Sequence, residues 1–205
     1  MESYITIKKE SSFEYEDRKS VFIGQAKPVE TEADALAFLA SVKKQYPDAR
    51  HHVYAYVLRE NSTMRFSDDR EPQGTAGLPV LDVIRKNHCT DTVIVVTRYF
   101  GGTLLGTGGL VHAYTAAALG ALVDAEIITY DTYSEYEVQV SYSDYQKLLP
   151  ILPTHEFREG GVEYTDNVLI RGTLKKSGED AFADDIVQTT AGRAIVRKIA
   201  EKYDY

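Results

Sequence analysis

Residues 92–123 read TVIVVTRYFGGTLLGTGGLVHAYTAAALGALV. The segment begins with an apolar, β-branched run, Thr92 to Tyr99, which is typical of a strand buried on both faces. Five glycines follow within nine positions, and a run of small residues from Leu110 to Val123 then favours a helix. Glycine pairs next to an alanine-rich helix indicate that the backbones of helix and sheet approach closely. The segment therefore predicts a domain in which this helix packs on a central strand.

Helix-like and strand-like patterns alternate before this segment, which is typical of the mixed α/β class. We expect a pair of strands at residues 4–9 and 20–28. Thr31, with Asp34 three residues later, forms a capping-box variant and predicts a helix that ends at Tyr46-Pro47. Three further elements are expected: a strand over 52–59, a long connector over 60–75 and a helix over 76–86.

The second half of the chain has a different order of elements. It predicts a strand, a helix, two strands joined by a turn, a helix and a strand. These elements are expected at residues 134–140, 144–149, 156–164, 168–174, 179–190 and 194–199. This βαββαβ order is the ferredoxin-like arrangement. We therefore expect two domains, residues 1–130 and 131–205, both within the usual size range.

Composition limits the classes of function. Of the 205 residues, 23 are basic and 31 acidic; the formal charge of −8 argues against a protein that coats nucleic acid or an anionic membrane. The two predicted domains carry −3 and −5, so neither is basic overall. Cys89 is the only cysteine, which excludes an internal disulfide and a multi-cysteine zinc site. The polar start of the chain and the shortness of its apolar runs predict a cytoplasmic protein without a membrane partner.

The connector leads into the segment SDDREPQGTAGLPVL, residues 67–81. Its three carboxylates, Asp68, Asp69 and Glu71, have two interpretations. They are groups of the kind that bind Mg²⁺ or act as an acid–base pair. Asp and Pro are also ordinary turn formers, so the same residues fit a loop held by local hydrogen bonds. We expect the second interpretation, which assigns no metal and no cofactor to the chain.

The glycines after the central strand also have two interpretations. Backbone N–H groups of a glycine-rich loop that leads into a helix bind anions such as phosphate, and Arg98 adds a charge at the end of the strand. The segment lacks the GK[ST] of a Walker loop and fails GxGxxG at the last position. In the alternative, the glycines only allow tight turns and close packing. The glycines concerned are Gly101, Gly102, Gly106, Gly108 and Gly109.

Aromatic and histidine side chains complete the candidate cleft. Tyr99 and Phe100 lie next to the glycines, where an aromatic ring either stacks on a nucleic-acid base or fills the core at a strand end. The five histidines are too scattered for an HxxxH or HExxH metal site. Among them, His52 and His112 are the two that could converge with Asp69. The candidate cleft consists of Asp68, Asp69, Glu71, Arg98, Tyr99 and His112.

Two segments, SDDREPQGTAGLPVL at 67–81 and VVTRYFGGTLLGTGGLVHAY at 95–114, closely resemble the signature segments of the YigZ/IMPACT family. The family patterns run SDDGEPSGTAG.P and VVTRYFGG..LG.GGLVRAY. RKSVFIG at 18–24 and HHVYAY at 51–56 fit the same family, so the resemblance covers nearly the whole chain. It implies a two-domain protein of the bacterial type. The first domain would be similar to the second domain of ribosomal protein S5 and the second ferredoxin-like, both similar to C-terminal domains of elongation factor G.

The sequence departs from the family patterns at three positions. Arg70 replaces a glycine of SDDGEP, which argues against a tight turn with positive φ there. Gln73 stands where serine is usual. His112 replaces the arginine of GGLVRAY and removes a permanent charge next to the predicted anion site.

Three functions remain open, the third of which is a protein-interaction module without chemistry. The first follows from the resemblance, because eukaryotic relatives regulate translation by binding a ribosome-associated protein. It is a translation-related binding protein that docks on RNA, the ribosome or a ribosome-associated protein. The second is an enzyme or small-ligand binder that holds a phosphate at the glycine-rich helix start and uses Asp69, Glu71 or His112 as acid or base. We expect the binding protein, and the sequence does not indicate the oligomeric state.

Overall fold

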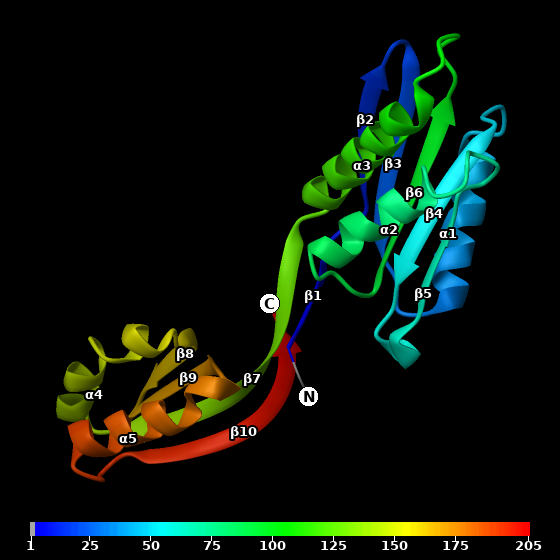
Figure 1. The fold of residues 1–205 in the computed structure, drawn as a ribbon. Coiled ribbons are helices and arrows are strands. Elements are labelled where there is room, and N and C mark those ends of the chain that lie inside the picture. The colour runs from blue at the N-terminus through cyan, green and yellow to red at the C-terminus, as the bar shows by residue number, and fades with distance from the viewer. Residues whose placement is uncertain (1–2) are drawn as a thin grey trace. The chain divides into compact units, whose positions relative to one another are not determined.

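The computed structural model describes residues 3–205 (Figure 1). The chain divides into two compact units, Tyr4–Thr129 and Tyr130–Tyr205, which we describe separately as the N-terminal and the C-terminal unit. The described part is a mixed α/β protein with five α-helices and two β-sheets, as the alternating patterns predict. Within these residues, no helix is both long and apolar enough to cross a membrane.

An antiparallel sheet forms the centre of the N-terminal unit. Its strands lie in the order β2-β3-β6-β4-β5. Their bounds are β2 Ser11–Asp17, β3 Ser20–Pro28, β4 His51–Val57, β5 Met64–Ser67 and β6 Thr92–Tyr99. A short strand β1, Tyr4–Ile7, is not part of this sheet and pairs with β7, Ile127–Val140. The bounds and the central place of β6 confirm the prediction made from its apolar run.

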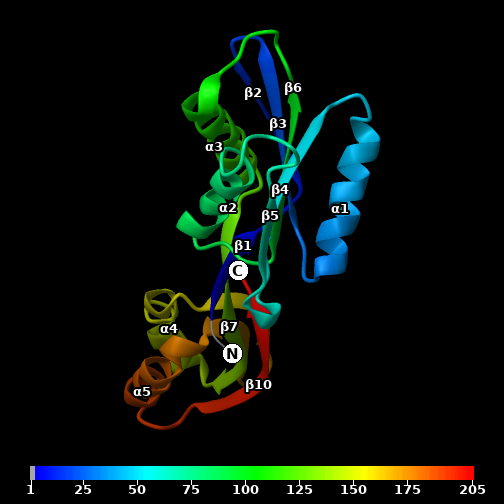
Figure 2. The same ribbon diagram turned by 45° about the vertical axis from the view of Figure 1, so that its right-hand side comes forward.

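Helices cover both faces of this sheet (Figures 1 and 2). Their bounds are α1 Glu32–Gln45, α2 Gly77–Lys86 and α3 Gly106–Asp124. On β6, Ile94 and Val96 belong to the core under α2 and α3. Val93 and Val95 belong to the core under α1. Because successive side chains of a strand point to opposite faces, a strand covered on both faces is apolar at every position.

Two local predictions about the helices are confirmed. At the start of α1, the Thr31 hydroxyl accepts a hydrogen bond from the Asp34 N–H at 3.1 Å, and the Asp34 carboxylate accepts one from the Thr31 N–H at 3.2 Å. The close approach of helix and sheet occurs at Gly24 of β3. A Cβ atom there would lie 2.3 Å from the carbonyl oxygen of Ala117 in α3. Any side chain at this position would push the helix away from the sheet.

Other predictions about the N-terminal unit are wrong. Residues 4–9 do not pair with residues 20–28, because β3 lies between β2 and β6. The edge strands β2 and β5 are missing from the prediction. Glu14 and Glu16 break the apolar pattern of β2 on its exposed face, and β5 is a four-residue strand inside the predicted connector. Helix α3 begins at Gly106, four residues before the predicted start, so Gly108 and Gly109 are helical.

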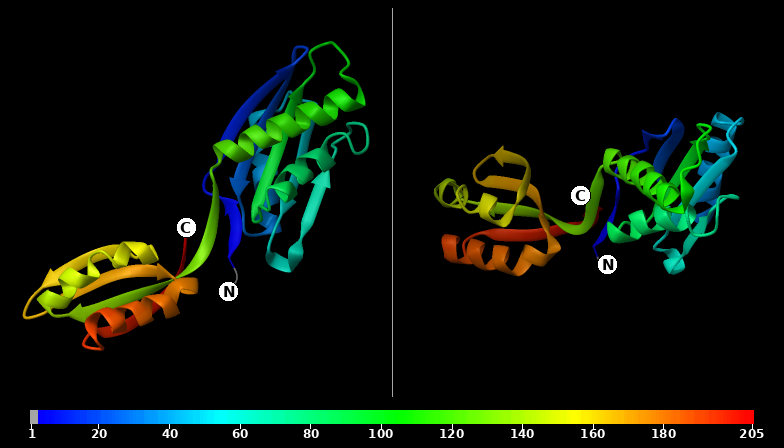
Figure 3. Two further views of the ribbon diagram at one scale, coloured as in Figure 1. Left: turned by 60° about the vertical axis from the view of Figure 1, so that its left-hand side comes forward. Right: turned by 45° about the horizontal axis from the view of Figure 1, so that its top comes forward.

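The C-terminal unit has the predicted βαββαβ order (Figure 3). Its elements are β7 Ile127–Val140, α4 Tyr142–Leu148, β8 Arg158–Tyr164, β9 Val168–Lys175, α5 Glu179–Thr190 and β10 Ile195–Asp204. The antiparallel strands lie in the order β8-β9-β7-β10. Leu148 of α4 and Phe182 of α5 pack in one core with Val138 and Ile170 of the sheet. This is the ferredoxin-like arrangement. Short 3₁₀ turns complete the chain at Glu60–Ser62, Leu152–His155 and Lys176–Gly178.

Candidate functional site

The two signature segments meet at one end of the N-terminal sheet. Strand register places Arg98, near the end of β6, between Phe22 of β3 and His51 of β4. The segment that follows β5 returns to the same place, because the carboxylate of Asp69 accepts a hydrogen bond from the backbone N–H of His52 at 2.7 Å. This end of the sheet therefore brings residues of both segments together.

A buried hydrogen-bonded cluster joins the segments. Glu71 Oε1 accepts a hydrogen bond from Arg98 Nη1 at 2.6 Å and another from the Tyr114 hydroxyl at 2.8 Å. All three residues are at least nine-tenths buried. Burial, together with the neighbouring Glu71 carboxylate, raises the pKa of Tyr114 far above its usual value, so the hydroxyl stays protonated and donates. The cluster ties the loop after β5 to the central strand and to α3.

Arg98 has one polar atom that the cluster does not use. Its Nε is buried and has no hydrogen-bond partner among the described residues. The guanidinium lies 5.4 Å from the centre of the Phe22 ring and 5.7 Å from that of Phe100. Arg98 is therefore held between a buried carboxylate and two aromatic rings, and it is not a free surface cation.

Asp68 holds the start of α2. Its Oδ1 accepts hydrogen bonds from the backbone N–H groups of Ala76 at 3.1 Å and Gly77 at 2.8 Å, and its Oδ2 accepts one from Gly74 at 2.9 Å. The residue at the helix start, Ala76, has no side chain that could do this. Asp68 thus acts as a helix cap supplied from eight residues upstream.

Asp69 and the two histidines of β4 form a second set of structural contacts. His51 Nδ1 donates to the carbonyl oxygen of Asp69 at 2.9 Å, and His51 Nε2 lies 4.0 Å from Glu71 Oε1. The ring of His52 turns elsewhere, because its Nε2 donates to the carbonyl of Tyr46 at 3.1 Å. Burial lowers the pKa of His52, which keeps this ring neutral.

The three carboxylates therefore serve three different sets of partners. Asp68 binds backbone N–H groups, Asp69 binds β4 and Glu71 binds Arg98 and Tyr114. Among the residues that the structure describes, no three His, Cys, Asp or Glu side chains are placed to hold a metal ion. The geometry favours the loop held by local hydrogen bonds over a magnesium site.

The backbone of Arg70 has a positive φ, although the replacement of glycine by arginine argued against this conformation. Its φ is +71° and that of Asp69 is +40°, so the turn is kept although a side chain is present. The Arg70 side chain is 78% exposed, and its Nη2 donates to the carbonyl of Arg50 at 2.8 Å. Gln73, the second departure, is exposed.

The five glycines after β6 differ in what they do. Gly101 lies against the backbone of Lys19, where a Cβ would be 2.1 Å from the carbonyl carbon, and Gly109 has Leu105 Cβ at 2.9 Å. Gly102 and Gly106 have φ of +87° and +72°, which glycine adopts without strain. Gly108 differs from all of these. It is helical, and apart from its chain neighbours and the backbone of its own helix no atom lies within 4 Å of the place of its Cβ.

The two remaining candidates are not part of the buried cluster. The Tyr99 hydroxyl donates to Asp48 at 2.8 Å, at the surface. His112 is exposed, and its ring packs edge-on against Tyr15 of β2, 6.0 Å between centres. Residues two apart on a helix do not share a face, so His112 points away from Tyr114. The structure brings His52 to Asp69 only through its backbone, and it does not bring His112 there.

Sequence reasoning missed Tyr114, which is a member of the cluster, and His51, whose ring lies beside Glu71. Tyr114 is fully buried in a helix of small residues, and a buried hydroxyl needs a hydrogen-bond partner. That requirement is the signal that would have pointed to it. His51 offers no comparable signal, because only the register of β4 against β6 places it next to Glu71.

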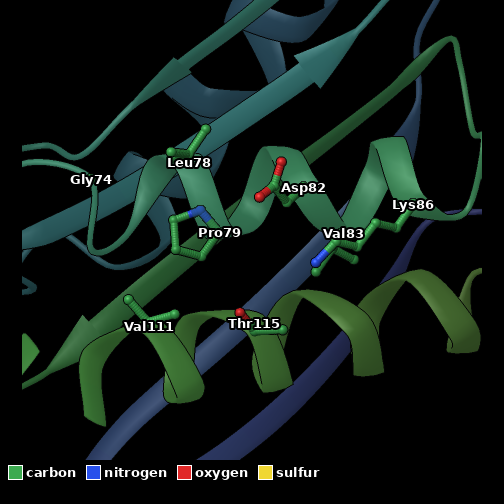
Figure 4. A pocket seen from close by; sticks show the side chains of 8 residues that line it. All are labelled: Gly74, Leu78, Pro79, Asp82, Val83, Lys86, Val111 and Thr115. Atoms are coloured by element: carbon green, nitrogen blue, oxygen red, sulfur yellow. The ribbon is translucent and has the colours of Figure 1, made fainter. Parts of the chain in front are cut away.

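A shallow groove between α2 and α3 lies beside this site (Figure 4). Its volume is about 220 Å³, below the range of about 300–1,000 Å³ that is usual for small-ligand pockets. It is lined by Gly74, Leu78, Pro79, Asp82, Val83, Lys86, Val111 and Thr115. None of the candidate acid–base residues lines it. The geometry therefore gives no support to an enzyme that uses these residues in this groove.

The fold and the site define a two-domain α/β protein with a buried carboxylate–arginine–tyrosine cluster at one end of its first sheet. Residues 18–122 match the Impact N-terminal domain, and residues 138–193 match a domain of unknown function, DUF1949. The chain is 33% identical over 199 residues to IMPACT family member YvyE of Bacillus subtilis, covering 97% of this chain and 92% of the relative. It belongs to the IMPACT family, as the signature segments predict.

Two further likenesses bear on the family. The bovine protein named Protein IMPACT is 30% identical over 105 residues, which cover 49% of this chain and 33% of that protein. A solved structure titled "Crystal structure of an hypothetical protein" is 32% identical, covers 98% of both chains and has a TM-score of 0.61. The likeness to the bovine protein is thus partial, whereas the solved structure has both units.

Proposed function

We propose that the protein is a translation-related binding factor that docks on the ribosome, or on a ribosome-associated protein, through the end of the N-terminal sheet described above. Family membership supports the general role, because the family resemblance points to regulation of translation. We further propose that residues 1–130, with an S5-like fold, and residues 131–205 act as separate domains in the cytoplasm.

The lack of a packing role for Gly108 is the observation by which we locate the docking surface. A helical glycine without a packing role destabilises a chain by about 0.5–1 kcal/mol relative to alanine. The other four glycines have a reason within the chain, either a close contact or a positive φ. Gly108 has open space where its Cβ would be. Close approach of another molecule to the helix backbone supplies the reason that the chain itself does not.

Exposed apolar side chains next to Gly108 support the same surface. Phe100 is 54% exposed and Leu104 is 81% exposed, both in the loop between β6 and α3. Exposed aromatic and aliphatic residues near polar surroundings are typical of docking sites. The buried Glu71–Arg98 pair would then hold the loop after β5 in place without contacting the partner.

Co-sedimentation with ribosomes at moderate salt tests the proposal. Gly108→Ala should leave the fold intact or slightly stabilise it, and Gly108→Glu should bring a carboxylate to the surface; both should weaken co-sedimentation. The matched control is Val123→Glu, which adds the same charge at the exposed far end of the same helix. Co-sedimentation of Gly108→Glu equal to that of the control would contradict the proposal.

A further inference from the structure

Four basic side chains lie along the end of the N-terminal sheet that carries Gly108. Arg18 and Lys19 form the turn between β2 and β3, because Asp17 pairs with Ser20. Gly101 packs on the backbone of Lys19, so this turn lies against the loop after β6. Arg50 precedes β4 at the same end, and Arg70 follows β5, where its guanidinium bonds to the carbonyl of Arg50.

Three of these cations have no ion-pair partner among the described residues. All four residues are exposed. Among the described residues, the side chains of Arg18, Lys19 and Arg50 form no ion pair, whereas Arg70 forms a long one with Asp69 at 3.9 Å. Three unpaired cations at one end of a sheet are unexpected in a chain whose formal charge is −8.

Several carboxylates at this end are engaged within the chain. Asp48 accepts from the Tyr99 hydroxyl, and Asp69 accepts from the His52 N–H. Asp68 and Glu71 bind backbone N–H groups and the Arg98 guanidinium, respectively. Glu16 and Asp17, just before the turn, form no side-chain hydrogen bond or ion pair in the described chain, and Asp48 and Glu16 are exposed. Asp68, Asp69 and Glu71 are therefore used inside the fold, whereas the other carboxylates lie at the surface beside the cations.

Two turns hold these cations in a strained backbone conformation. Arg18 and Lys19 have φ of +47° and +65°. A two-residue hairpin turn of this kind strongly prefers Asn-Gly, because left-handed φ strains residues with a side chain by about 1–2 kcal/mol. Asp69 and Arg70 are left-handed as well. Strain of this kind is concentrated at functional sites. It indicates that these positions are occupied by basic residues for the function of their side chains and not for the stability of the turn.

An exposed aromatic ring lies within the row. Phe100 follows β6, between the Arg18–Lys19 turn next to β3 and Arg50 at the start of β4. Strands in a sheet are about 4.8 Å apart, so the two intervals from β3 to β4 span about 10 Å, and the Arg70 guanidinium lies beside Arg50 at the β4 end. That length suits a polymer of repeated negative charges better than one phosphate group. Cations that follow a backbone, combined with an aromatic ring on which a base stacks, are the usual elements of a site for single-stranded nucleic acid.

We infer that this surface, defined by Arg18, Lys19, Arg50, Arg70 and Phe100, binds single-stranded RNA, with the cations on phosphates and the Phe100 ring on a base. The inference rests on the proposed function, since it names the chemistry of the partner at the same surface. It restricts recognition to the N-terminal unit, and it predicts strongly salt-dependent binding.

The test uses a labelled oligouridylate and fluorescence anisotropy with the full chain. We expect binding at low salt, and a slope of log K against log salt of about −3 if four cations contact phosphates. Arg18→Asn/Lys19→Gly removes two charges and installs the residues that the turn prefers. This variant should therefore have a higher Tm and at least about tenfold weaker RNA binding.

A matched control removes two charges elsewhere. Lys86→Gln/Arg197→Gln changes exposed cations at the far end of α2 and in β10. It should bind RNA like the original chain, whereas Phe100→Ala should bind about tenfold more weakly, because base stacking is lost. Equal weakening in the control and in Arg18→Asn/Lys19→Gly would overturn the inference, as would a chain that binds no RNA at low salt.

The two experiments distinguish a failure of the RNA inference from a failure of the proposed function. Ribosome co-sedimentation that depends on Gly108 but not on Arg18 and Lys19 would overturn the RNA inference and leave the proposed function standing. RNA binding that depends on Arg18 and Lys19, without ribosome co-sedimentation, would contradict the proposed function and support the RNA surface.

Discussion

The C-terminal unit and the end of the N-terminal sheet arrange their charges differently. In the C-terminal unit, basic side chains pair with acidic ones on the surface. Arg171 bridges Glu137 and Glu163, and Lys198 lies between Glu179 and Glu201 at 2.7 and 2.6 Å. At the end of the N-terminal sheet, Asp68, Asp69 and Glu71 are used inside the fold, and Arg18, Lys19 and Arg50 form no ion pair among the described residues.

This difference shows why net charge alone is a poor guide to this protein. A charge of −8 describes the whole chain, but the surface charge at one place depends on which acids are engaged internally. The C-terminal unit pairs most of its cations with neighbouring carboxylates. The N-terminal unit uses Asp68, Asp69 and Glu71 to build its loop and leaves Arg18, Lys19 and Arg50 without an ion pair among the described residues.

Breaking one ion pair in each unit should change the stability of the fold by very different amounts, and one of these changes is the largest that we expect. Arg98→Leu leaves Glu71 buried without its cation, which we expect to destabilise the fold by about 3–5 kcal/mol. Lys202→Ala removes the exposed pair with Glu135 and should change stability by less than about 1 kcal/mol. Urea unfolding measures both. Equal losses would show that the buried cluster does not hold the loop after β5.

Two glycines of the N-terminal unit should respond to alanine with opposite signs. Gly24→Ala places a Cβ against the Ala117 carbonyl and should destabilise the chain by about 1–3 kcal/mol. Gly108→Ala meets no atom and should stabilise it by up to about 1 kcal/mol. Thermal unfolding of the two variants checks this, and a loss of stability in Gly108→Ala would mean that the glycine serves the fold.

A smaller effect concerns pH. Burial lowers the pKa of His52 in the folded chain, so below about pH 6.5 the unfolded chain binds the proton more readily. The contribution of His52 to stability should therefore be constant above that pH and should be lost as the pH falls below it. We expect a Tm decrease of about 1–2 °C between about pH 7.5 and about pH 5.5 that is smaller in His52→Gln. An unchanged pH dependence in that variant would assign the effect to another group.

The sequence predicts the covered strands and the helices better than the edge strands. The bounds of β6, β3 and α5 follow from local patterns, because a strand covered on both faces is apolar throughout and a helix has its own period. The edge strands β2 and β5 have no such pattern. Their place depends on pairing with β3 and β4, which is not a local property of the sequence.

The candidate site shows the same limit. The signature segments point to Asp68, Glu71 and Arg98, but their residue types do not show that these groups bind each other and a helix start. The left-handed turn at Arg70 is contrary to the preference of its residue type. It is held by contacts with β4 and Arg50, which only the folded chain provides.

Hydrogen–deuterium exchange of the chain with and without ribosomes shows which part of the protein contacts its partner. We expect ribosomes to slow exchange at residues 17–20 and 100–108 of the N-terminal unit and to leave β8, β9 and β10 unchanged. Slower exchange confined to the C-terminal unit, or none in the N-terminal unit while the chain co-sediments, would contradict the proposed docking surface.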